Sequence, residues 1–130
     1  MKRITGAVVV GLVAVALIAT LASAGRQSQA GGSSGSVTIV LEDFHFVPNR
    51  IDVKVGVPLT VRLTNRGTER HDLNFESIHM PGLRGVESIL EPGETRTITL
   101  QFDAPGSHTF ICTLPGHAAA GMTGAAYVTQ

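Results

Sequence analysis

A chain of 130 residues, 43% of them hydrophobic, is long enough for one compact domain with a real core and too short to hold two comfortably. Ten lysines and arginines balance ten aspartates and glutamates, and no long run of one charge occurs. The composition therefore gives no electrostatic footprint for nucleic acid or for an anionic membrane surface, and we expect neither as a partner.

The first segment has the features of an export signal. Two basic residues precede an uncharged apolar stretch over residues 4–25, which closes on the small residues Ala-Ser-Ala. This pattern is typical of a signal peptide, and we assign residues 1–24 to one. The stretch is also long enough to span a membrane, so the alternative is an uncleaved anchor. This anchor would then be the only part of the chain in contact with the membrane. In both cases we expect an exported protein, in the periplasm or on the extracellular face of the cell membrane.

The next segment has the composition of a linker. Residues 25–36 read GRQSQAGGSSGS and contain too little apolar surface to order themselves. Such Gly- and Ser-rich sequence predicts a flexible tether between the leader and the rest of the chain. The globular domain is therefore expected over residues 37–130.

Short runs of alternating polarity follow the linker. Because successive side chains of a strand point to opposite faces of a sheet, this alternation predicts half-buried strands. The predicted strands cover residues 37–41, 51–55, 59–63, 97–102, 107–112 and 126–129. Clusters of Gly, Pro and Asn separate these runs and predict turns.

No long helical pattern interrupts these strands. Many short strands separated by Gly and Pro turns favour an all-β fold, either an antiparallel β-sandwich or a small barrel. Residues 76–90 fit no strand template, because they mix polarity without a period and contain Pro-Gly. We interpret this segment as a loop that has room for a helical turn.

Three potential metal ligands, Cys112, His117 and Met122, fall within eleven residues near the C-terminus. A thiolate, an imidazole nitrogen and a thioether together suit copper as it cycles between its two oxidation states. The set matches structural zinc sites poorly, since these use two to four thiolates. A turn through residues 115–116 can bring His117 back beside the sulfur. A trigonal site needs a second imidazole, and the candidate is His71, 41 residues before Cys112.

The combination resembles the cupredoxin superfamily, the plastocyanin- and azurin-like type 1 blue copper proteins. The likeness covers nearly the whole globular segment and is carried by residues 44–48, 51–56, 65–71, 90–94, 102–112 and 112–122. The sequence CTLPGH at residues 112–117 is similar to azurin's ligand loop, and the spacing from His117 to Met122 is similar to plastocyanin's. The resemblance implies a Greek-key β-sandwich that holds one copper ion near one end, with the ligands His71, Cys112, His117 and Met122.

The sequence departs from the family pattern at two positions beside these ligands. Asp72 stands where plastocyanin and azurin have an asparagine that braces the cysteine loop. Aspartate still accepts backbone N–H bonds, but its charge is expected to influence the metal or the rigidity of the loop. His108 occupies a position where the family often has tyrosine, and we interpret it as a core histidine.

The resemblance implies a monomeric carrier of single electrons between redox proteins, and no enzyme. Two alternatives stay open. One is an exported copper carrier or chaperone that delivers copper to an oxidase, to which His79 and Met80 would add copper(I) ligands. The other is a copper-free structural domain. Because residues 104–130 hold no charged side chain, redox partners are expected to dock on an apolar patch around His117, formed by residues 114–116 and 118–120.

Overall fold

The computed structural model describes residues 34–130. The predicted leader, residues 1–24, and most of the predicted linker, residues 25–36, lie outside the described residues. Within residues 34–130, no helix is long and apolar enough to cross a membrane.

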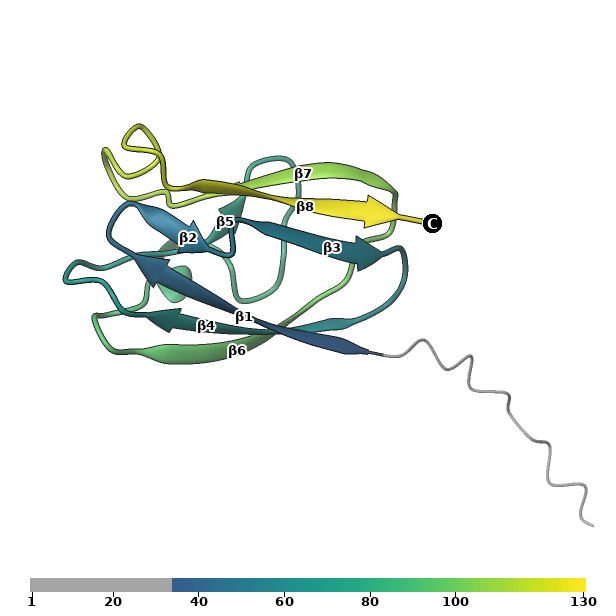
Figure 1. The fold of residues 1–130 in the computed structure, drawn as a ribbon, viewed down its shortest axis with the longest axis horizontal. Helices are drawn as coiled ribbons and strands as arrows, with labels where there is room; N and C mark the ends of the chain where they lie inside the picture. The colour runs from purple at the N-terminus through teal and green to yellow at the C-terminus, as the bar shows by residue number, and fades with distance from the viewer. Residues whose placement is uncertain (1–33) are drawn as a thin grey trace, which may run out of the picture. The chain divides into compact units, whose positions relative to one another are not determined.

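The described chain forms eight strands and one short helix, packed as two four-stranded sheets (Figure 1). One sheet has the order β2-β1-β4-β6 and the other the order β3-β8-β7-β5. This arrangement confirms the predicted all-β sandwich. The elements are β1 (Gly35–Glu42), β2 (His45–Val47), β3 (Arg50–Lys54), β4 (Leu59–Asn65), β5 (Asn74–Phe75), the 3-10 helix η1 (Gly85–Ser88), β6 (Thr95–Leu100), β7 (Gly106–Ile111) and β8 (Thr123–Thr129).

Both sheets are mixed, whereas the sequence led us to expect antiparallel pairing throughout. β4 runs parallel to β1 and β8 runs parallel to β3, while the other pairs are antiparallel. The reason is the path of the chain. After the β1–β2 hairpin the chain crosses to the second sheet as β3, and it returns to the first sheet as β4 beside β1. β1 also begins at Gly35, inside the expected linker, because β4 pairs with it from Leu59 onward.

The core lies between the two sheets and follows the predicted alternation. In β4, the side chains of Leu59, Val61 and Leu63 are buried, while those of Thr60 and Arg62 are exposed. Removing such apolar side chains from water is the main source of stability, at about 25 cal/mol per Å² buried. Four phenylalanines join the sheets through edge-to-face contacts with ring centroids 5.2–5.7 Å apart: Phe46, Phe75, Phe102 and Phe110.

His108 and the segment 76–90 both contact this core. His108 lies half-buried in β7 beside Phe102, with ring centroids 5.3 Å apart, and neither of its ring nitrogens has a hydrogen-bond partner. Its ring therefore packs at the border of the core, which agrees in part with the expected core histidine. The segment 76–90 is a loop that contains η1 and buries Met80 and Leu83 in the core.

Loops far apart in the sequence gather at one end of the sandwich, opposite the C-terminus (Figure 1). They are the β1–β2 turn, the segment that follows β4, and the long β7–β8 loop. The last two carry all four predicted metal ligands. The topology thus places these ligands at a single end of the fold.

Gly124 in β8 is expected to be essential for packing against Phe110 on the neighbouring strand β7. A Cβ atom at this position would lie 2.3 Å from the ring of Phe110 and 2.6 Å from the carbonyl oxygen of Asn49. Gly124→Ala should therefore destabilise the domain by about 1–3 kcal/mol, the usual cost of overpacking a core. The measurement is the free energy of unfolding by denaturant.

Gly35→Ala is the matched control, because its new methyl group would lie 3.4 Å from Leu59, an ordinary contact. In a strand, this change should be neutral or stabilise the domain by up to about 1 kcal/mol. Equal unfolding midpoints for the two variants would contradict the close approach at Gly124.

Candidate metal centre

The β7–β8 loop is closed by its own backbone. Cys112 directly follows β7, and its N–H donates to the carbonyl oxygen of Met122 (3.1 Å), whose own N–H donates to that of His117 (3.0 Å). The N–H of His117 donates to the carbonyl oxygen of Leu114 (3.1 Å), and the intervening Gly116 has a φ of +84°, which favours glycine. This turn carries His117 back beside Cys112, as the Pro-Gly sequence predicted.

A second loop delivers His71 from the other side. His71 exchanges two backbone hydrogen bonds with Leu90, at 3.2 and 2.8 Å. The buried Asn65, at the end of β4, donates from its side chain to the carbonyl oxygens of Glu69 (2.8 Å) and Leu90 (3.0 Å) and accepts from the N–H of Gly67 (2.9 Å). Asn65 therefore fixes the turn that positions His71.

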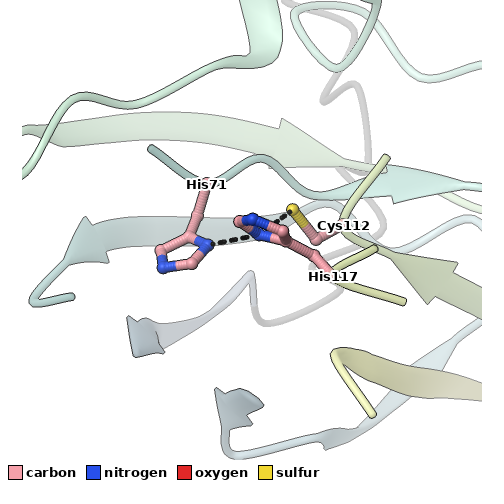
Figure 2. A group of neighbouring side chains, drawn as sticks. All are labelled: His71, Cys112 and His117. Atoms are coloured by element: carbon pink, nitrogen blue, oxygen red, sulfur yellow. Dashed lines mark hydrogen bonds between the residues drawn. The ribbon is translucent and has the colours of Figure 1, made fainter. Parts of the chain in front are cut away.

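The side chains of His71, Cys112 and His117 point toward one another (Figure 2). The Nδ1 atoms of the two histidines lie 3.1 Å apart, and Cys112 Sγ lies 3.4 Å from His117 Nδ1. Their donor atoms all lie within 4.8 Å of one another, and all three residues are buried. Metal bonds of about 2.0–2.1 Å to nitrogen and about 2.3 Å to sulfur would span such separations. The donor set and spacing therefore fit one copper ion.

Met122 is joined to both Cys112 and His117 by the backbone hydrogen bonds of the β7–β8 loop. Its carbonyl oxygen accepts from Cys112, and the residue is completely buried. The structure thus brings its backbone next to that of the cysteine. The other two candidates lie in a different segment, between β5 and η1, where Met80 is buried and His79 is exposed.

Asp72 braces the cysteine loop in the way expected from the sequence. One carboxylate oxygen accepts the N–H of Thr113 (2.6 Å), and the other accepts the Thr113 hydroxyl and the side-chain N–H of Asn74 (2.9 Å). Asp72 is 1% exposed. The segments of both predicted ligands, His71 and Cys112, are thereby tied together through their neighbouring residues.

Two carboxylates that the sequence analysis missed contact the far nitrogens of the imidazoles. Nε2 of His71 lies 3.0 Å from Oδ1 of Asp43, and Nε2 of His117 lies 3.2 Å from Oε2 of Glu69. Asp43 is 28 residues from its histidine, and no motif links the two. The only available signal was an acidic residue two positions after the first predicted strand.

The surroundings of His117 differ in part from the predicted apolar patch. The histidine is 7% exposed, and Phe44 lies edge-on to it with ring centroids 5.2 Å apart. On the side of Glu69, a surface groove borders His117. Its lining includes three charged residues and part of the predicted patch: Thr68, Glu69, Arg70, Glu91, Pro92, Leu114 and Pro115. The surface around His117 is therefore apolar on the side of the β7–β8 loop and charged on the side of Glu69.

Copper binding is expected to release a proton from Cys112. Burial raises the pKa of its thiol to about 11, so the metal-free protein carries the thiol at neutral pH, whereas a metal binds the thiolate. The apparent copper(I) affinity should therefore rise about tenfold per pH unit between pH 7 and 9. Calorimetry of copper(I) binding in buffers of different ionisation enthalpy measures the proton released.

In this experiment Cys112→Ser provides the control, because it has no thiol to deprotonate. An affinity that does not change over this pH range would contradict thiolate ligation by Cys112.

Comparison with known proteins places the chain in a family. A family model described as a cupredoxin-like domain matches residues 11–123. The copper-resistant cuproprotein CopI of Pseudomonas aeruginosa is 26% identical over 143 residues, covering 77% of this chain and 79% of CopI. Auracyanin-B of Chloroflexus aurantiacus is 45% identical over 49 residues, which are 38% of this chain and 21% of auracyanin-B.

Solved structures share the fold. The dithionite-reduced auracyanin of Roseiflexus castenholzii superposes with a TM-score of 0.64 at 23% identity, covering 77% of this chain and all of auracyanin. A multicopper oxidase gives a TM-score of 0.61 at 21% identity, covering 72% of this chain and 41% of the oxidase. At these identities the likeness shows the fold alone. With the family match over most of the sequence, the expected fold, resemblance and copper cofactor are confirmed, and the chain belongs to the cupredoxin-like family.

Proposed function

We propose that this chain is an electron-transfer protein that holds one copper ion with His71, Cys112, His117 and Met122. The observation that carries the proposal is the buried set of three donors, with Nδ1 to Nδ1 at 3.1 Å and Sγ to Nδ1 at 3.4 Å. Bound copper supplies one-electron chemistry between its two oxidation states. A donor set held by the fold changes little between these states, which is what rapid electron exchange requires.

Each residue has a separate role in this proposal. Cys112 binds as the thiolate, His71 and His117 supply the other strong bonds through Nδ1, and Met122 makes a weak axial contact that tunes the potential. Asp72 keeps the two segments in register through its bonds to Thr113. Burial of the cysteine, at 0% exposure, keeps water from the sulfur.

The deciding experiment is the optical and spin-resonance spectrum of the copper-loaded domain, together with its voltammetry. An electron carrier gives intense visible absorption, a reversible one-electron wave and slow loss of copper. Weak absorption and an irreversible wave would overturn the proposal.

The alternative is a copper carrier, and the similarity to CopI, named as a copper-resistant cuproprotein, favours it. A carrier would prefer copper(I) strongly and give it up to an acceptor within the time of mixing. Incubation of the copper(I)-loaded domain with a second copper(I)-binding protein, followed by separation and metal analysis, distinguishes the two functions. Retention of copper supports the electron carrier, and rapid transfer supports the alternative.

We also propose that the protein is exported and works as a monomer outside the cytoplasm, on the basis of the leader-like residues 1–24. Redox partners dock on the apolar side of His117, over the exposed Ala119 and Ala120 and their neighbours in the patch. Weak redox encounters bury little area and must dissociate quickly, and a small apolar patch suits both requirements.

Ala119→Glu is expected to slow electron transfer to a redox partner about tenfold, the effect of roughly 1.4 kcal/mol in docking, because it buries a charge in an apolar contact. The wild-type rate should depend only modestly on salt. Ala104→Glu is the control, since Ala104 is exposed in the β6–β7 connection, away from the loops that carry the ligands. Equal rates for the two variants, or a wild-type rate that falls steeply with salt, would place docking elsewhere.

A further inference from the structure

Asp43 is held in a fixed position beside the candidate metal centre. It directly follows β1, and its carboxylate accepts hydrogen bonds from the N–H of Thr68 (2.9 Å), the hydroxyl of Thr68 (2.9 Å) and the N–H of Glu69 (3.3 Å). Its remaining contact is Nε2 of His71, at 3.0 Å. Three donors from the loop after β4 thus hold the carboxylate in place against the histidine.

This arrangement decides which nitrogen of His71 carries the proton. Three donors, the N–H and hydroxyl of Thr68 and the N–H of Glu69, already point at the Asp43 carboxylate, which therefore acts as an acceptor. Nε2 of His71 must therefore donate, which leaves the lone pair on Nδ1. Nδ1 is the atom that faces His117 and Cys112.

The backbone at Gly67 packs directly against this hydrogen bond. A Cβ atom at Gly67 would lie 2.3 Å from Oδ1 of Asp43 and 2.7 Å from Nε2 of His71. Only a hydrogen atom fits there, so glycine is required for space. The close packing agrees with the complete burial of His71.

We infer that Asp43 is a positioning residue for His71: it fixes the ring with Nδ1 toward the metal, and its negative charge favours copper(II) over copper(I). This inference rests on the proposed function, in which His71 is a copper ligand. A carboxylate behind a metal-bound histidine raises the basicity of the ligand, and such partners commonly contribute 10- to 100-fold to metal affinity. Because copper(II) carries the larger charge, its affinity depends more on Asp43 than that of copper(I).

Glu69 provides the matched comparison on the other imidazole. It approaches Nε2 of His117 at 3.2 Å, but its side chain is 57% exposed, whereas that of Asp43 is 34% exposed and held by three other donors. Exposed carboxylates are free to move and are screened by solvent and salt. Removing the charge of Glu69 should therefore change the site much less.

The test is Asp43→Asn, which keeps the size of the side chain and an oxygen acceptor but removes the charge. Competition titrations should show a 10- to 100-fold loss of copper(II) affinity and a smaller loss of copper(I) affinity. Each tenfold loss selective for copper(II) corresponds to a rise of about 59 mV in the reduction potential. Glu69→Gln should change both affinities by less than threefold.

A second variant and a metal-free measurement separate positioning from a general effect on folding. Gly67→Ala keeps both partners but forces them apart, and it should shift the potential in the same direction. In the metal-free protein, nitrogen NMR should find His71 protonated at Nε2 in the wild type and a mixture of tautomers in Asp43→Asn. A copper(II)-to-copper(I) affinity ratio and a tautomer that are both unchanged in Asp43→Asn overturn the inference, while the wild-type spectrum decides the proposed function separately.

Discussion

Replacing Cys112 with serine is expected to abolish the intense visible absorption of the oxidised, copper-loaded protein. In a site of this kind the colour arises when light moves an electron from the thiolate sulfur to copper(II). The serine hydroxyl does not ionise at neutral pH, and its oxygen holds its electrons more tightly, so it cannot supply this transition. The visible spectrum of each oxidised protein at equal copper content is the measurement.

The structure makes this substitution informative because the hydrogen bonds that close and brace the loop do not depend on the sulfur of Cys112. Its backbone bond to Met122 and the brace from Asp72 to Thr113 do not involve its sulfur. Serine is also close to cysteine in size. The loss of the band should therefore occur in a folded domain, which far-ultraviolet circular dichroism can verify.

His79→Gln is the control, because His79 is an exposed histidine outside the gathered donor set. It should keep the full band. A copper-loaded wild type without strong visible absorption, or a Cys112→Ser variant that retains it, would show that the sulfur does not bind copper(II).

Local sequence patterns were enough to predict most strands and the C-terminal loop of the site. Leu59, Val61 and Leu63 alternate with polar residues, which predicts a strand with one buried face. In the sandwich, this face of β4 is buried against the core. Cys112 and His117 are five residues apart, so a single turn closed by local hydrogen bonds brings them together. These features could be predicted because they depend on residues that are close together in the sequence.

Features that depend on the path of the whole chain escaped prediction. β1 and β4 pair in parallel only because the chain visits the second sheet between them. Asp43 meets His71, and Gly67 packs on their contact, only because the β1–β2 turn and the loop after β4 lie at the same end. His71 itself was found through the family resemblance and the need for a second imidazole, since its spacing from Cys112 carries no local signal.

Met122→Leu is expected to keep copper bound and to raise the reduction potential. In our proposal the thioether is a weak axial donor that stabilises copper(II) more than copper(I), and leucine replaces it with apolar bulk. A tenfold selective loss of copper(II) affinity would raise the potential by about 59 mV, and we expect a shift of about this size. Voltammetry of the loaded variant measures it.

The surrounding structure should tolerate this change. Met122 is completely buried, and exchanging methionine for leucine in a core usually costs less than about 1.5 kcal/mol. Its bonds to Cys112 and His117 use only backbone atoms, so the loop stays closed without the thioether. The other proposed ligands, with donor atoms 3.1 and 3.4 Å apart, then suffice to hold the ion.

Met80→Leu provides the matched control, because Met80 is also a buried methionine of the core but lies in the loop that contains η1. It removes a thioether from the same protein without touching the β7–β8 loop, so it should leave the potential unchanged. Complete loss of copper from Met122→Leu would make the methionine a principal anchor of the metal. A potential equal to that of Met80→Leu would mean that the thioether makes no contact with copper, and either result would remove Met122 from its proposed role.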